Sequence, residues 1–315
     1  MPRVYVVGAY LPTGGAFMAY HLARILRLDF GYEGWVVTVQ GETPDHGVFT
    51  YDPQFPAIEL AELPECIEDQ DILIANPSFS AHMLGMRCRG RKVMYAQGFS
   101  TYDLLDCRFD LYVSVSGFVQ NFLRSVYGIA TEVIPPFLQS DLFPAVTPWR
   151  QRAENSVLLH NKNPEPRRST LAERLLSLIR SQRPDIDPCP LSDGGKLPQQ
   201  DFTARLGQTR YLLSLGPAEG FGLIPLEAMA MGTTVVGFDG FGGRDFMRPG
   251  ENCASVAWPQ IERLAEQFLD LLDDPARAEA LAVRGMAEAC APLYGYARFR
   301  SDWCAQFQRL LNDQP

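Results

Sequence analysis

Two glutamates, Glu219 and Glu227, are the residues whose type and spacing indicate chemistry most directly. They stand eight positions apart, on either side of a glycine-bearing turn. A carboxylate accepts hydrogen bonds from hydroxyl groups but repels phosphate, so both side chains suit a ligand that presents hydroxyls, as a sugar does. We therefore expect a hydroxyl-binding site in this part of the chain.

The elements around the glutamates predict a second kind of contact. The apolar run 211–215 is typical of a buried strand, and Pro225 suits the first position of a helix, where its missing N–H costs nothing. Gly220 and Gly222 let the backbone approach a ligand, and the N–H groups and dipole at a helix start attract phosphate. The turn is predicted to bind phosphates and hydroxyls together.

The stretch 214–232 resembles the Glu-x7-Glu motif of the retaining glycosyltransferases with the GT-B architecture, those like glycosyltransferase family 4. The resemblance implies that Glu219 contacts the sugar of a nucleotide-sugar donor and that Glu227 binds the ribose. The diphosphate would then meet the backbone of Gly220, Phe221, Gly222 and Leu223.

The sequence departs from the family pattern at two places downstream. Thr234 stands where the family usually has proline, and Asp245 stands where a glutamate is usual, with one residue deleted. Chance spacing of two glutamates and a nicotinamide-binding fold are the competing interpretations. The second is disfavoured because the glycine pattern near Gly240 lacks its final glycine.

Leaving-group charge on a pyrophosphate must be stabilised by cations, so basic side chains are expected at the donor site. Lys162 and Arg167 keep the charge and the five-residue spacing of the arginine and lysine that the family shows after the first strand of its second domain. Lys162 stands where the family has arginine, and Arg168 is a candidate substitute for that arginine. A solvated basic loop remains the alternative for this segment.

The first half of the chain offers three further residues for the reaction. Gly14 and Gly15 match the glycine pair that follows the family's first strand, and the resemblance implies that they approach the reacting centre. Gln97 stands at the strand end where retaining members often have a histidine. Glutamine hydrogen-bonds a hydroxyl but exchanges no proton near neutral pH, so we expect it to position the substrate.

Strand-like and helix-like segments alternate along the chain, which predicts α/β architecture with parallel sheets covered on both faces. The resemblance implies GT-B organisation, two Rossmann-like domains whose sheets face a cleft. We expect an acceptor-side domain at 1–148, a nucleotide-sugar domain at 149–292 and a C-terminal helix at 293–315. Trp303, Phe307 and Leu310 suit either docking of this helix on the first domain or an ordinary core face.

Composition limits the partners and the location. The formal net charge of −9 argues against a nucleic-acid partner. Seven scattered cysteines form neither a disulfide framework nor a zinc motif, and no apolar run approaches about 18 residues, so a cytoplasmic protein is expected. Glu42, Asp45 and His46 lack metal-ligand spacing, and no Asp-x-Asp pair is placed for a metal, so neither metal nor cofactor is expected.

The expected activity is transfer of a hexose-like sugar from a nucleotide-sugar to a hydroxyl acceptor, with retention implied by the resemblance alone. A GT-B phosphorylase or epimerase, and a nucleotide-sugar-binding protein that has lost catalysis, are the alternatives. The basic cluster 87–92 is either a solvated loop or a contact for an anionic acceptor or membrane headgroups, which would make the protein peripheral on the inner face of the membrane.

Overall fold

The computed structural model describes residues 1–161, 166–191 and 196–312. They form two compact units. Unit 1 combines Met1–Phe137 with Tyr296–Pro315, and unit 2 is Leu138–Gly295. No described helix is both long and apolar enough to cross a membrane.

Unit 1 is built on a seven-stranded parallel sheet in the order β3-β2-β1-β4-β5-β6-β7. Its central strands are buried on both faces, which is why they consist of continuous apolar runs. The strands are β1 (Arg3–Val7), β2 (Glu33–Thr38), β3 (Ala57–Glu59), β4 (Ile72–Ala75), β5 (Arg91–Ala96), β6 (Leu111–Ser114) and β7 (Glu132–Val133).

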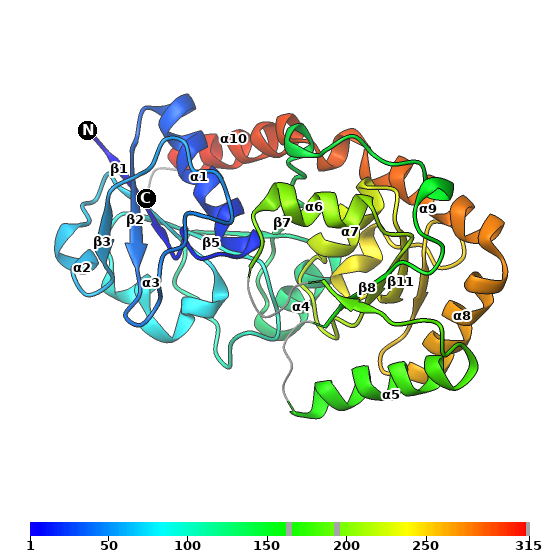
Figure 1. Cartoon of the computed structure of the whole chain (residues 1–315). Coiled ribbons are helices and arrows are strands. Elements are labelled where there is room, and N and C mark those ends of the chain that lie inside the picture. Colours follow the sequence, from blue (N-terminus) through cyan, green and yellow to red (C-terminus); the bar gives the residue numbers. More distant parts are fainter. Residues whose placement is uncertain (162–165, 192–195, 313–315) are drawn as a thin grey trace. The chain divides into compact units, whose positions relative to one another are not determined.

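Helices cover this sheet, and the last of them returns from the C-terminal end of the chain (Figure 1). They are α1 (Gly14–Phe30), α2 (Leu63–Cys66), η1 (Pro77–His82), α3 (Leu84–Arg87), α4 (Gly117–Tyr127) and α10 (Tyr296–Asn312). Helix α10 packs beside α1, where Arg300 pairs with Asp29 and Arg24 Nη1 donates to Tyr296 Oη at 3.1 Å. The expected return of the C-terminal helix to the first part of the chain is confirmed.

Unit 2 is built on a five-stranded parallel sheet in the order β12-β11-β10-β8-β9. The strands are β8 (Val157–His160), β9 (Cys189–Pro190), β10 (Tyr211–Ser214), β11 (Thr234–Phe238) and β12 (Ala254–Val256). The helices are η2 (Ser140–Leu142), η3 (Trp149–Gln151), α5 (Pro166–Gln182), α6 (Gln199–Gly207), α7 (Leu223–Ala230), η4 (Gly242–Asp245), α8 (Ile261–Asp273), α9 (Pro275–Ala289) and η5 (Pro292–Tyr294). Two parallel sheets with this helical cover confirm the predicted α/β class.

Strand order locates the place where each unit can bind a ligand. The connections change direction between β1 and β4 in unit 1, and between β8 and β10 in unit 2. Open parallel sheets bind ligands beyond the carboxyl ends of strands at such a switch point. In unit 2 the switch point lies directly before the turn that carries Glu219.

Candidate donor site and its counterpart in unit 1

The turn after β10 is held rigidly by the loop that follows β11. The Glu219 N–H donates to Gly240 O at 2.7 Å, and the Gly242 N–H donates to Glu219 O at 3.1 Å. A Cβ on Gly242 would lie 2.1 Å from Gly220 O, so only glycine lets the two loops approach this closely. The backbone of Glu219 is therefore fixed by hydrogen bonds on both sides.

Helix α7 begins two residues earlier than the sequence predicts. Leu223 is its first residue, so Pro225 is third rather than first. The helix starts there because Gly222 adopts a left-handed conformation, φ 96°, which ends the preceding turn. Proline is still tolerated in the first helical turn, where no intrahelical bond needs its N–H.

The start of α7 directs two N–H groups away from the helix. The Leu226 N–H makes the first bond back along the chain, to Gly222 O at 3.3 Å, and Pro225 has no N–H. Leu223 and Ile224 therefore supply the donors of the first turn, which together with the helix dipole favour an anion. The Phe221 side chain is buried against Phe246, so only its backbone can serve a ligand.

Glu227 lies on α7 and is 9% exposed. Its Oε1 accepts a hydrogen bond from Gln199 Nε2 of α6 at 2.5 Å. Burial raises the pKa of Glu227 to about 7, although the bond from Gln199 works in the opposite direction. Gln199 could not be identified from the sequence, because the stretch before it has little periodicity and its contact with Glu227 spans 28 positions.

The switch point of unit 2 carries a second polar pair that sequence analysis did not identify. His160 ends β8 and Ser214 ends β10, and His160 Nδ1 lies 3.2 Å from Ser214 Oγ. Both residues are buried. Parallel pairing of β8 with β10 places His160 opposite Ser214, which explains the contact.

The basic residues predicted for this site are only partly placed. Lys162 lies outside the described residues. Arg167 and Arg168 fall in the first turn of α5, and only their backbone is described. Helix α5 follows β8, so the backbone of both arginines comes after the carboxyl end of a strand that borders the switch point.

Unit 1 brings its own three predicted residues together. Thr13 caps α1 by accepting from the Ala16 N–H, and Gly14 and Gly15 form the helix start. Gln97 follows β5 and donates through Nε2 to Gly15 O at 2.8 Å. A Cβ on Gly15 would lie 2.9 Å from Gln97 Oε1, so the glycine provides the space that the glutamine occupies.

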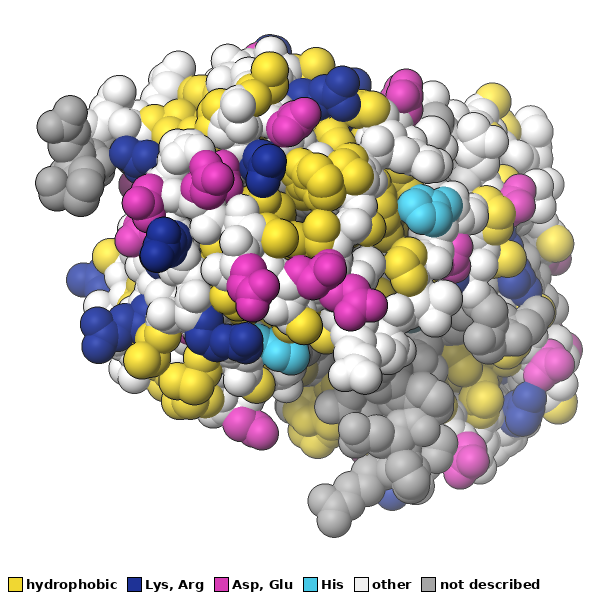
Figure 2. Space-filling model, turned by 90° about the vertical axis from the view of Figure 1, so that its left-hand side faces the viewer, with side chains coloured by type: hydrophobic (Ala, Val, Ile, Leu, Met, Phe, Trp, Pro, Cys, Tyr) yellow, Lys and Arg dark blue, Asp and Glu magenta, His cyan; other side chains and the backbone are white. Residues whose placement is uncertain are grey.

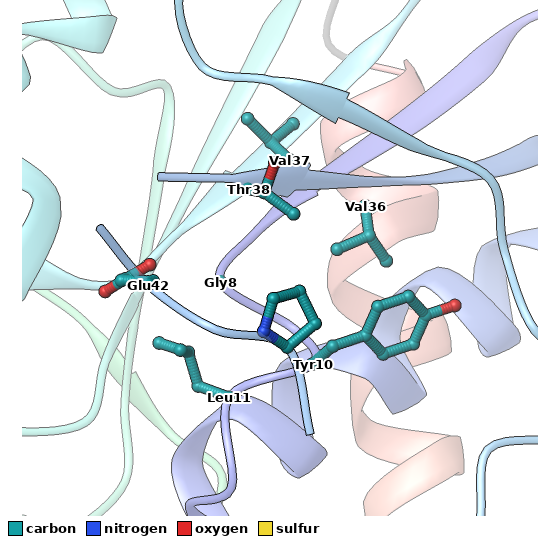
Figure 3. Close-up of a pocket in the computed structure, with 8 residues that line it drawn as sticks. Gly8, Tyr10, Leu11, Val36, Val37, Thr38 and Glu42 are labelled. Atoms are coloured by element: carbon teal, nitrogen blue, oxygen red, sulfur yellow. The ribbon is translucent and has the colours of Figure 1, made fainter. Parts of the chain in front are cut away.

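A small cavity of about 10 Å³ lies beyond the carboxyl ends of β1 and β2 (Figure 3). Gly8, Leu11, Thr38 and Glu42 line it, together with Tyr10 and Pro44. It has room for about one water molecule and is too small for a sugar. Burial raises the pKa of Glu42, whose Oε2 is buried and has no hydrogen-bond partner in the described parts of the chain.

Among the described residues no three acidic, cysteine or histidine side chains are placed to hold a metal ion. The arrangement in unit 2 therefore offers carboxylates for hydroxyl groups and helix N–H groups for an anion, which is the recognition chemistry of a sugar phosphate.

Comparison with known proteins finds one family that matches part of the chain. Residues 195–286, which contain the α7 turn, match the family described as Glycosyl transferases group 1. No curated protein sequence matches the chain.

Solved structures share the fold across the chain. The chain is similar to sucrose-phosphate synthase from Thermosynechococcus elongatus, with a TM-score of 0.72 and 14% identity over 100% of both chains. It is also similar to Anabaena HepE, solved with UDP-glucose, with a TM-score of 0.76 and 13% identity over 98% of this chain and 100% of the other. A glycosyltransferase from Rickettsia africae gives 0.72 and 14% over 99% of each. The chain has the GT-B fold, and the stretch that matches the glycosyl transferases group 1 model lies within its second unit.

Proposed function

We propose that this protein is a glycosyltransferase that moves a hexose-like sugar from a nucleotide-sugar to a hydroxyl acceptor, with retention and without a metal ion. The observation that supports it best is the pair formed by Glu219, in the turn before α7, and Glu227, on α7, at the switch point of a parallel sheet. The likeness to HepE, which was solved with UDP-glucose, favours a UDP-sugar as the first donor to test.

Each candidate site residue of unit 2 has a role in donor binding. Glu219 accepts hydrogen bonds from the sugar hydroxyls, and its clamped backbone keeps the carboxylate in place. Glu227 accepts from the ribose, with Gln199 orienting its carboxyl group. The Leu223 and Ile224 N–H groups, with Lys162, Arg167 and Arg168, stabilise the charge on the leaving diphosphate.

Unit 1 contributes positioning rather than proton transfer. Gln97 is fixed by Gly15 and presents its amide oxygen for a hydroxyl group. Since an amide cannot take a proton, the acceptor hydroxyl would lose its proton to the leaving phosphate. A binding protein without catalysis is the alternative that Gln97 favours, because it stands where a histidine is usual.

The test is nucleotide binding by wild type, Glu227→Ala and Glu219→Ala. Thermal shifts with UDP, GDP, ADP, dTDP and CMP, each with and without Mg²⁺, identify the nucleotide. We expect Glu227→Ala to weaken its affinity about tenfold or more, the loss of a hydrogen bond to a charged group. Glu219→Ala should spare nucleotide affinity and lower sugar transfer.

The matched control is Glu266→Ala, which removes an exposed carboxylate from α8. Equal nucleotide affinity in wild type and Glu227→Ala would contradict the ribose assignment. Binding without transfer or donor hydrolysis would identify the non-catalytic alternative. Phosphate-dependent sugar release would instead identify a phosphorylase, and release of the sugar's epimer an epimerase.

A further inference from the structure

Helix α3 with its flanking residues, 83–89, and the loop 103–110 form one surface patch of unit 1. Asp106 accepts hydrogen bonds from the Gly85 N–H at 2.8 Å and from the Arg108 N–H at 3.1 Å. A Cβ on Gly85 would lie 2.7 Å from Arg108 Cβ, so the backbone of α3 lies directly against the loop 103–110. This contact places Arg108 beside the basic segment that contains Arg87 and Arg89.

The basic residues of this patch form no ion pairs with described carboxylates. Arg87, Arg89 and Arg108 are exposed, and in the described chain none of them has a carboxylate partner within salt-bridge distance. Lys92, by contrast, lies 3.8 Å from Asp110. Asp106 is buried, and its carboxylate accepts hydrogen bonds from backbone N–H groups. The exposed acids of the loop 103–110 are Asp103 and Asp110.

Large apolar side chains are exposed in the same two segments. Met83 is 48% exposed, Met86 66% and Leu104 67%. Met83 also holds a positive φ of 53° at the start of α3, a conformation uncommon outside glycine. Figure 2 shows one face of the molecule, on which basic side chains lie beside hydrophobic ones.

We propose that these six residues, the Arg-Met patch, bind the surface of an anionic membrane. Unpaired arginines attract the lipid phosphates, while Met83, Met86 and Leu104 enter the boundary between headgroups and acyl chains. A nucleic acid would pair with the arginines but would leave the three apolar side chains without a partner. A lipid surface matches both halves of the patch.

The experiment is sedimentation of the full chain with vesicles of phosphatidylcholine alone or mixed with phosphatidylglycerol. The variant is Arg87→Ser/Arg89→Ser/Arg108→Ser. Each basic residue near a membrane contributes about a fivefold factor in partitioning, so the triple variant should partition about 100-fold less onto the anionic vesicles. Met86→Ser/Leu104→Ser should also reduce binding, with weaker dependence on salt.

The matched control is Arg124→Ser/Arg263→Ser/Arg277→Ser, which removes the same charge from exposed positions elsewhere. We expect the control to bind like wild type. An equal loss of vesicle binding in both triple variants would show that net charge alone determines binding, and would contradict the proposal that this patch is the binding site. Wild type that fails to sediment with anionic vesicles, or a patch that retains a single-stranded oligonucleotide instead, would overturn the choice of partner.

Discussion

Glu227 should make the stability of this protein depend on pH, which can be measured without any ligand. Its pKa is raised by burial to about 7, above the value of about 4.5 in an unfolded chain. Between these values the folded state binds more protons than the unfolded state, so stability falls as pH rises through this window. From pH 5 to pH 8 the free energy of unfolding should fall by up to about 3 kcal/mol.

Chemical denaturation of wild type and Glu227→Gln at several pH values checks this expectation. Glutamine keeps the shape and can still meet Gln199 but does not titrate, so its stability should depend less on pH. Glu266→Gln, an exposed change on α8, should retain the wild-type slope. A Glu227→Gln variant with the full wild-type slope would assign the effect to another group.

At the level of single residues, the sequence predicted those whose chemistry is visible in their type. Glu219 and Glu227 stand in the sequence beside glycines that allow a close backbone approach, so a candidate site could be proposed there from the sequence. Gln199 could not, because an amide has no distinctive pattern until packing brings it to a carboxyl group. Glu42 was considered only as a metal ligand, and the cavity that buries it is formed by separate segments.

Among the elements, the contact between the two loops of unit 2 should be sensitive to one methyl group. A Cβ on Gly242 would overlap the backbone oxygen of Gly220, which no flexible side chain can relieve. Gly242→Ala should destabilise the protein by roughly 2–4 kcal/mol and weaken nucleotide binding. Urea denaturation measures the loss, with Gly47→Ala as control because its nearest neighbour is a movable side-chain oxygen at 3.3 Å. A Gly242→Ala protein as stable as the control would show that the loops separate easily.

Elements with long apolar runs were predicted well, and short ones were not. Strand β10 occurs where the apolar run 211–215 predicts it, and the buried strands β1 and β4 are apolar runs of the same kind. Edge strands β3, β7 and β9 have two or three residues, which is too short for alternation to be recognised. The start of α7 was misplaced because the left-handed Gly222, rather than the proline, determines it.

For the molecule as a whole, stability of unit 1 should depend on the last helix. Trp303 of α10 is fully buried, with its ring 5.0 Å from Tyr95 and 5.3 Å from Phe307 between centroids. Trp303→Ala should cost about 3–5 kcal/mol of unfolding free energy. Tyr95 lies on β5 two residues before Gln97, so the variant should also disturb the Gln97 contact with Gly15.

Denaturation followed by circular dichroism measures the effect of Trp303→Ala. Val283→Ala, which shortens a 57% exposed side chain on α9, is the control and should change stability by less than about 0.5 kcal/mol. Unchanged stability of Trp303→Ala would mean that α10 adds little to unit 1.

The chain leaves unit 1 after Phe137 and returns at Tyr296, and these two points are neighbours. The Leu138 N–H donates to Tyr294 O at 2.8 Å, and the rings of Phe137 and Tyr296 lie 4.9 Å apart between centroids. Unit 2 is thus one uninterrupted insertion whose ends meet, which is the geometry that lets one domain be spliced into another. A direct junction of Phe137 to Tyr296 would join the two parts of unit 1 into one continuous chain, so residues 138–295 could be removed or replaced as a single segment.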